Sequence, residues 1–124
     1  MQLRLGKIPN EPSINITMST AELWTSPWNL TISGRALGFD TNYIKNIHPG
    51  PWCGNMSKKT FTHTGYTGVQ FCADPEIDVI TVMLTNRVYP TEENVKNILR
   101  VRDEFNTAVA EAVRRKPSDD FDED

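Results

Sequence analysis

Residues 60–86 read TFTHTGYTGVQFCADPEIDVITVMLTN, and this stretch decides the fold. Within it, Val69, Phe71 and Ala73 alternate with Gln70 and Cys72, which predicts a strand with one buried face. The next segment, DPEID, places a proline between aspartates, as is typical of a turn. It is followed by VITVMLTN, which is β-branched and almost continuously apolar and therefore predicts a strand buried on both faces. We expect an antiparallel pair of strands joined by a tight loop.

The period of the apolar residues changes after Pro90, where a long helix is predicted. Thr91 is suited to cap its first turn, which carries two glutamates that interact favourably with the positive end of the helix dipole. Apolar residues then recur at spacings of three and four, at Val95, Ile98, Leu99, Phe105, Val109, Ala112 and Val113. Arg102 interrupts this stripe, so we expect it to pair with an acid or to lie at the edge. Pro117 is expected to end the helix.

The signals upstream are shorter. Ser19, followed by Glu22, forms a capping box for one or two helical turns that Pro27 stops. A short apolar run at 35–41 predicts a strand. The proline- and glycine-rich segment 42–59 predicts a loop.

These elements predict one α+β domain at residues 19–116, with an antiparallel sheet of three to four strands and the long C-terminal helix packed on one face. Residues 1–18 are expected to form an irregular lead-in, and residues 117–124 a disordered acidic tail. One helix covers only one face of a sheet. Because exposed apolar faces and open strand edges mark interfaces, we expect a protein partner chain to cover the open sheet and its apolar face.

Composition argues against several classes of function. The 124 residues carry a net charge of -3 with no basic stripe, so nucleic-acid binding is not expected. No run approaches the roughly 18 apolar residues of a membrane-spanning helix. The first residues lack the apolar core of a secretory signal, which favours a cytoplasmic or organellar protein, mitochondria included. No metal-ligand spacing is present, and we expect neither a metal nor a cofactor.

Two further features concern covalent chemistry. Cys53 lies in a predicted loop and Cys72 in a predicted strand, and we expect Cys72 to be a buried free thiol. A disulfide between them would require an oxidising compartment. Asn15, Asn29 and Asn55 each begin an Asn-x-Ser/Thr sequon. Such triplets arise by chance in a chain rich in asparagine and threonine, so without a signal peptide they do not by themselves indicate glycosylation.

Glycines in the strand-like run TFTHTGYTG raise the question of what lies against it. Glycine inside a strand often marks a bulge or the close approach of another group. Taken alone, the histidine in this run is expected to be a hydrogen-bonded residue at the surface or at a sheet edge. Together, however, ALGFDT, HTGYTG, DPEIDVITVMLTNR and the long helix resemble the C-terminal part of the serine β-lactamase-like hydrolases. That family includes class C β-lactamases and related penicillin-binding proteins and esterases, and the resemblance covers roughly residues 19–115.

The resemblance implies that His63, Thr64 and Gly65 occupy the family's Lys/His-Thr-Gly triplet, which lies at the sheet edge lining the active site. His63 would donate a hydrogen bond or carry charge near the substrate, and Thr64 would hydrogen-bond it. Gly65 would let the substrate approach the backbone, and the amide of Tyr66 would be one of two oxyanion donors. One departure is Thr62, which stands where many relatives have glycine and could narrow the pocket or tilt the strand.

The family's other catalytic elements are missing from this sequence. Its nucleophile is the serine of Ser-x-x-Lys, yet no serine here has a lysine three residues later, and no tyrosine begins Tyr-x-Asn. Ser13 begins only the looser Ser-x-Asn pattern, in a segment without periodicity. Without nucleophile and base no acyl-enzyme forms, so we expect the chain to be inactive alone. It would act as a subunit or fragment of a larger assembly, as part of a hydrolase completed by another chain, or as an independent small binding module.

Overall fold

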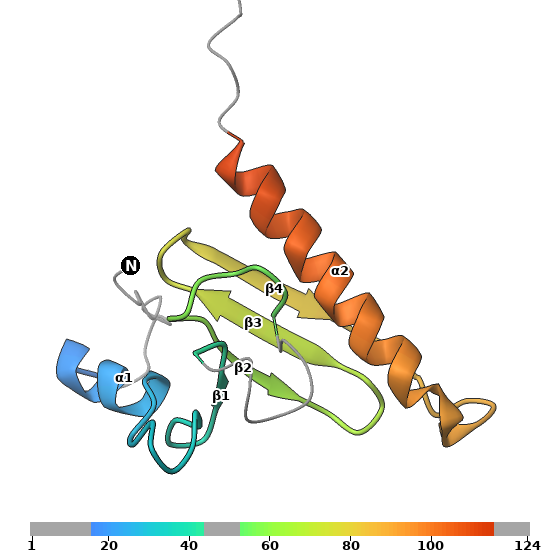
Figure 1. Ribbon diagram of the computed structural model, residues 1–124, viewed down its shortest axis with the longest axis horizontal. Helices are drawn as coiled ribbons and strands as arrows, with labels where there is room; N and C mark the ends of the chain where they lie inside the picture. Colours follow the sequence, from blue (N-terminus) through green and yellow to red (C-terminus); the bar gives the residue numbers. More distant parts are fainter. Residues whose placement is uncertain (1–15, 44–52, 116–124) are drawn as a thin grey trace, which may run out of the picture.

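The computed structural model describes residues 16–43 and 53–115 (Figure 1). Most of the expected lead-in and all of the acidic tail lie outside the described residues. The elements are α1 (Met18–Thr25), β1 (Asp40–Thr41), β2 (Phe61–Thr64), β3 (Gln70–Asp74), β4 (Val79–Met83), the 3-10 helix η1 (Glu92–Asn94) and α2 (Val95–Arg114). The four strands form one antiparallel sheet in the order β1-β2-β3-β4, and α2 packs across one face (Figure 1). The predicted α+β fold is confirmed.

The β3–β4 hairpin has the predicted turn, and Asp74 fastens it to the rest of the fold. Its Oδ1 accepts the N–H of Glu76 at 2.9 Å, while Asp78 adopts a φ of 53°, which aspartate tolerates. The same carboxylate accepts the backbone N–H of Ser57 at 2.6 Å and the Ser57 hydroxyl at 2.7 Å. One buried side chain therefore joins the hairpin turn to the loop that precedes β2.

The face of the sheet under α2 is polar at its centre. Thr62, Cys72 and Thr81 are neighbours across three strands, and all are buried. Asn106 of α2 lies above them: its Oδ1 accepts the Thr81 hydroxyl at 2.6 Å, and its Nδ2 donates to Gln70 Oε1 at 3.1 Å. A buried amide costs free energy unless its hydrogen bonds are satisfied, and here they are.

The stripe of α2 that faces the sheet differs from the predicted one. The buried residues of the helix recur every four positions: Ile98, Arg102, Asn106 and Ala110. Of the predicted stripe, Val95, Phe105 and Val113 are 47%, 37% and 45% exposed. An apolar pattern places the helix wrongly here because polar side chains with satisfied hydrogen bonds occupy the contact.

The opposite face of the sheet carries exposed apolar side chains. Because successive strand residues point to opposite faces, Phe71 and Ala73 point away from α2, as do Ile80 and Val82 of β4. The expectation that VITVMLTN is buried on both faces is wrong within the described chain. Since β4 is an edge strand, Ile80 and Val82 remain 59% and 60% exposed.

The cysteines also differ from expectation. Cys53 and Cys72 form a disulfide with a Cα–Cα distance of 6.1 Å, and both are fully buried. They pack with Met56 and Ala110 in the core under α2. The expected free thiol is therefore wrong, because the loop before β2 folds back under the helix onto β3. A sequence spacing alone does not reveal this contact.

Two elements near the start of the fold have other boundaries than the predicted ones. Helix α1 begins earlier than predicted because Thr17, and not Ser19, is its N-cap, its hydroxyl accepting the N–H of Thr20 at 3.2 Å. The strand expected at 35–41 shrinks to β1, because the chain bends at Gly38, which has a φ of 93°. The Thr91 cap is as predicted: its side chain accepts the N–H of the second glutamate that follows.

Candidate functional site

The four candidate positions lie together at the end of β2 and in the turn that follows it: His63, Thr64, Gly65 and Tyr66. His63 pairs with Phe71 across the ladder. The N–H of Gly65 donates to the carbonyl of Val69 at 2.8 Å, and that of Gly68 donates to the carbonyl of Gly65 at 3.0 Å. The structure therefore places the four at one hairpin tip, and their catalytic roles stay predictions.

Close contacts within the chain explain why both positions of this hairpin, 65 and 68, are glycine. A Cβ on Gly65 would lie 2.5 Å from Cγ2 of Val69, closer than carbon atoms approach. Gly68 has a φ of 97°, and a Cβ there would overlap the Thr85 hydroxyl and lie 3.2 Å from the side chain of Ile98. The close approach predicted from the glycines is thus made, at least in part, by the protein itself.

Arg102 of α2 binds the tip of the β2–β3 hairpin. Its Nε and Nη2 donate to the carbonyl of Gly68 at 3.2 and 2.8 Å, and Nη2 also donates to that of Val69 at 3.2 Å. Burial, with a smaller contribution from the charge of Arg87, lowers the pKa of Arg102. The expected acidic partner or edge position is wrong, because Arg102 is 6% exposed and bonds to backbone carbonyls.

The side chain of Tyr66 is tied to the segment that follows β4. The guanidinium carbon of Arg87 lies 5.0 Å from the centre of the Tyr66 ring, within cation–π range. A hydrogen bond with Glu92 raises the pKa of the Tyr66 phenol, lost solvation adds to the rise, and the charge of Arg87 opposes it. These contacts tie the Tyr66 ring to Arg87 and Glu92, and the role of its backbone amide stays a prediction.

His63 points to the face of the sheet opposite α2. Its neighbours across the ladder are Phe71 and then Val82, and together with Phe39 and Leu84 they line a shallow groove. The imidazole is exposed within this mainly apolar groove. Such an arrangement can orient one polar group of a bound molecule whose remainder is apolar.

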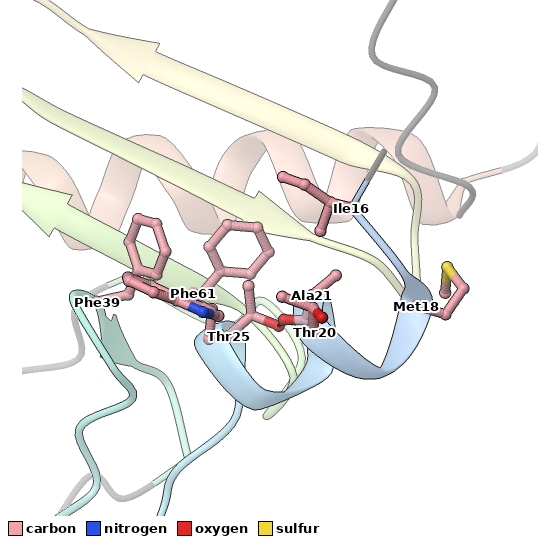
Figure 2. A pocket seen from close by; sticks show the side chains of 8 residues that line it. Ile16, Met18, Thr20, Ala21, Thr25, Phe39 and Phe61 are labelled. Atoms are coloured by element: carbon pink, nitrogen blue, oxygen red, sulfur yellow. Dashed lines mark hydrogen bonds between the residues drawn. The ribbon is translucent and has the colours of Figure 1, made fainter. Parts of the chain in front are cut away.

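An aromatic cluster extends the groove toward α1. The rings of Phe39, Phe61 and Phe71 pack edge-on or tilted, with centroids 5.3 to 6.4 Å apart. Beyond them is a pocket of about 460 Å³, with α1 on one side and Phe39 and Phe61 on the other (Figure 2). Its lining has no charged side chain: Ile16, Met18, Thr20, Ala21, Trp24, Thr25, Phe39 and Phe61.

Sequence reasoning missed both the cluster and the pocket. The three phenylalanines occupy three different strand-like runs, and each run indicates only which strand it forms. The register of the sheet is what brings the rings together. A signal that could have pointed to them is a phenylalanine in each of three runs expected to be adjacent strands.

Two other kinds of site are absent from residues 16–43 and 53–115. No three His, Cys, Asp or Glu side chains there come together in a way that could hold a metal ion. No helix in this part of the chain has the length and apolar character needed to cross a membrane.

Comparison with known proteins gives one family and one relative. A family model described as Beta-lactamase matches residues 1–104. The chain is also similar to a protein of Medicago truncatula named Truncated lectin 2, with 29% identity over 87 residues, or 68% of this chain. The alignment covers 31% of that protein, so the chain spans about a third of the curated relative it matches. No solved structure matches significantly.

Proposed function

The chain belongs to the β-lactamase family, and from that premise we propose that it is a partial hydrolase unit that is inactive alone and works within a larger assembly. The sequence contributes the His-Thr-Gly triplet but no Ser-x-x-Lys nucleophile and no Tyr-x-Asn element. A complementary polypeptide would cover the open face of the sheet. Where that polypeptide carries the nucleophile, the two would form an active serine hydrolase of the esterase or β-lactamase type.

The observation that carries the proposal is the distribution of side chains between the two faces of the sheet. The face under α2 holds the buried threonines and contacts Asn106 of the helix, whereas Ile80, Val82 and Leu84 on the other face are 59%, 60% and 81% exposed. Soluble monomers rarely leave such apolar patches uncovered. The edge strand β4 borders the same patch and offers unpaired backbone groups. Both features favour a docked partner.

His63 of the triplet lies on this same face, which connects docking with chemistry. A polypeptide that covers Val82 and Leu84 would also close the groove containing His63. Closure removes water and strengthens hydrogen bonds to a developing oxyanion. In the completed site, His63 and Thr64 would bind the substrate, Gly65 would allow close approach, and the amide of Tyr66 would donate to the oxyanion.

The test is the size and composition of the native particle. We would purify the protein from its source, measure its mass by size-exclusion chromatography with light scattering, and identify co-eluting chains by mass spectrometry. Val82→Arg on the open face should abolish the complex, while Val101→Arg, at a valine on α2 that is 39% exposed, should leave it intact. A 14.1 kDa monomer with a cooperative unfolding transition would refute the proposal. Ester or β-lactam hydrolysis by the complex, absent from the purified chain, would identify a shared active site.

A second candidate function, a small binding module, is favoured by the pocket beside α1. Its volume of about 460 Å³ falls in the range of small-molecule sites, and its lining is apolar. Ala21→Trp would fill it from the helix side. Saturable binding of a neutral aromatic probe by the monomer, lost in this variant, would support the module over the partial hydrolase.

A further inference from the structure

We propose that Asn29 is an N-glycan acceptor and that the chain folds in an oxidising compartment in which asparagine is glycosylated. The inference goes beyond the proposed function and does not depend on it. It joins two features of different chemistry: the disulfide between Cys53 and Cys72, and the geometry of the sequon Asn29-Leu30-Thr31.

The disulfide indicates the kind of compartment in which the chain folds. Disulfides persist in oxidising compartments and are rare where glutathione and thioredoxin keep thiols reduced. Both sulfur atoms lie in the core against Met56 and Ala110, where the pair is structural and shielded from exchange partners. Of the two compartments that the sequence left open, cytoplasmic and organellar, the disulfide favours an oxidising organelle or the secretory route.

The position of Asn29 is the second step. It lies in the connection between α1 and β1, in a tight turn whose neighbours Trp28 and Ile32 are 71% and 70% exposed. The turn uses the oxygen atoms of Asn29: Oδ1 accepts the N–H of Thr31 at 2.9 Å, and the backbone carbonyl accepts that of Ser33 at 2.9 Å. The amide nitrogen, Nδ2, takes no part in these bonds, and it is the atom that would be glycosylated.

Asn55 provides the contrast within the same chain. Its Nδ2 donates to Glu111 Oε1 at 3.4 Å, and its Oδ1 is buried. Its backbone N–H donates to the Thr107 hydroxyl at 3.1 Å, and its carbonyl accepts from Arg114 at 3.0 Å. A sugar at Asn55 would separate this loop from α2, whereas a sugar at Asn29 would extend into solvent over exposed apolar side chains. The folded structure therefore accommodates a glycan at Asn29 and not at Asn55.

Both reactions use co-reactants supplied by such a compartment. In glycosylation, Nδ2 of Asn29 loses a proton and bonds to the first sugar of a polyprenyl-diphosphate-linked oligosaccharide, while the sugar's bond to the diphosphate breaks and the polyprenyl diphosphate leaves. In disulfide formation, the two thiols give two protons and two electrons to a disulfide-bonded oxidoreductase, which leaves as the dithiol.

The experiment is mass spectrometry of the protein from its native source. We expect a glycopeptide containing Asn29, removed by peptide N-glycosidase, and no glycan on Asn55. The intact protein without reductant should be lighter than the reduced protein by the two thiol hydrogens. Thr31→Ala should abolish the glycan while keeping Asn29, and Thr31→Ser, which preserves the sequon, should retain it. Free thiols in the native protein, an unmodified Asn29, or a glycan only at Asn15 or Asn55 would each overturn the proposal.

Discussion

Replacing both cysteines by alanine should destabilise the chain by an amount that follows from the size of the loop they close. Cys53 and Cys72 are 19 positions apart in the sequence. The chain-entropy relation gives about 3.2 kcal/mol at 25 °C for a loop of this length. For a domain of this size, that loss corresponds to a fall in Tm of roughly 10–15 °C. The cross-link also holds the loop before β2 under α2, where Met56 and Ala110 complete the contact.

The assay is unfolding in guanidinium chloride, followed by circular dichroism, for the wild type and for Cys53→Ala/Cys72→Ala. Because both cysteines are fully buried, the wild type must be unfolded with reductant present before its bond can be cleaved. The reduced wild type should then unfold at the lower midpoint of the double variant, and reductant should not change the variant. Equal midpoints for the oxidised wild type and the variant, or a variant that still responds to reductant, would refute the reasoning.

Three further predictions concern single side chains. Arg102→Met should lower the free energy of unfolding by about 2–4 kcal/mol because it leaves the Gly68 and Val69 carbonyls unsatisfied. The control Arg100→Met removes only an exposed ion pair with Glu104 and should lower it by at most about 0.5 kcal/mol. Chemical denaturation measures both values. Gly68→Ala should lower the free energy of unfolding by about 2–4 kcal/mol because of the positive φ at this position and the overlap with Thr85. If the variant does not fold, its NMR spectrum should lack the native signals of the hairpin. Burial raises the pKa of Asp74, but hydrogen bonds from Ser57 and Glu76 outweigh it, so the pKa in the folded chain is lowered. The carboxylate therefore stabilises the fold at pH values above the ordinary aspartate pKa of about 3.9. That stabilisation is lost as the pH falls through the lower pKa of the folded state. Asp74→Asn should weaken that acid dependence in a pH series of unfolding midpoints, and an unchanged dependence would contradict it.

The elements with a strong local cause were predictable from the sequence. The strand in GVQFCA, the turn in DPEID and the Thr91 cap each depend on neighbouring residues, and each is present where expected. The buried face predicted for that strand is wrong, because Gln70 and Cys72 are buried under α2 while Phe71 is only half-buried. The position of α1 moved because Thr17 and Ser19 are both good caps, and the local sequence does not decide between them. The strand at β1 shortened because of the bend at Gly38.

Contacts between distant residues were not predictable in the same way. The pairing of Cys53 with Cys72 and the meeting of Arg102 with Gly68 join segments that only the folded chain brings together. For the candidate site, the sequence and the family resemblance identified the four positions at the hairpin tip. They could not show that α2 braces that tip, nor that Phe39 and Phe61 continue the groove toward α1.

The side of α2 that faces the sheet shows why the prediction from the sequence was wrong at the centre of the fold. A helix is usually placed by assigning its apolar stripe to the core, and that rule assumes that the buried contact is the apolar one. Here α2 contacts the sheet through Arg102 and Asn106, whose hydrogen bonds to Gly68, Gln70 and Thr81 make a polar interface possible. Such a network specifies one register of helix on sheet, because a shift by one residue would leave several buried groups unsatisfied. The exposed apolar side chains of the sheet, Ile80 and Val82, lie on the other face, near His63. Docking on that face is therefore the contact that the proposed function requires and that α2 does not supply.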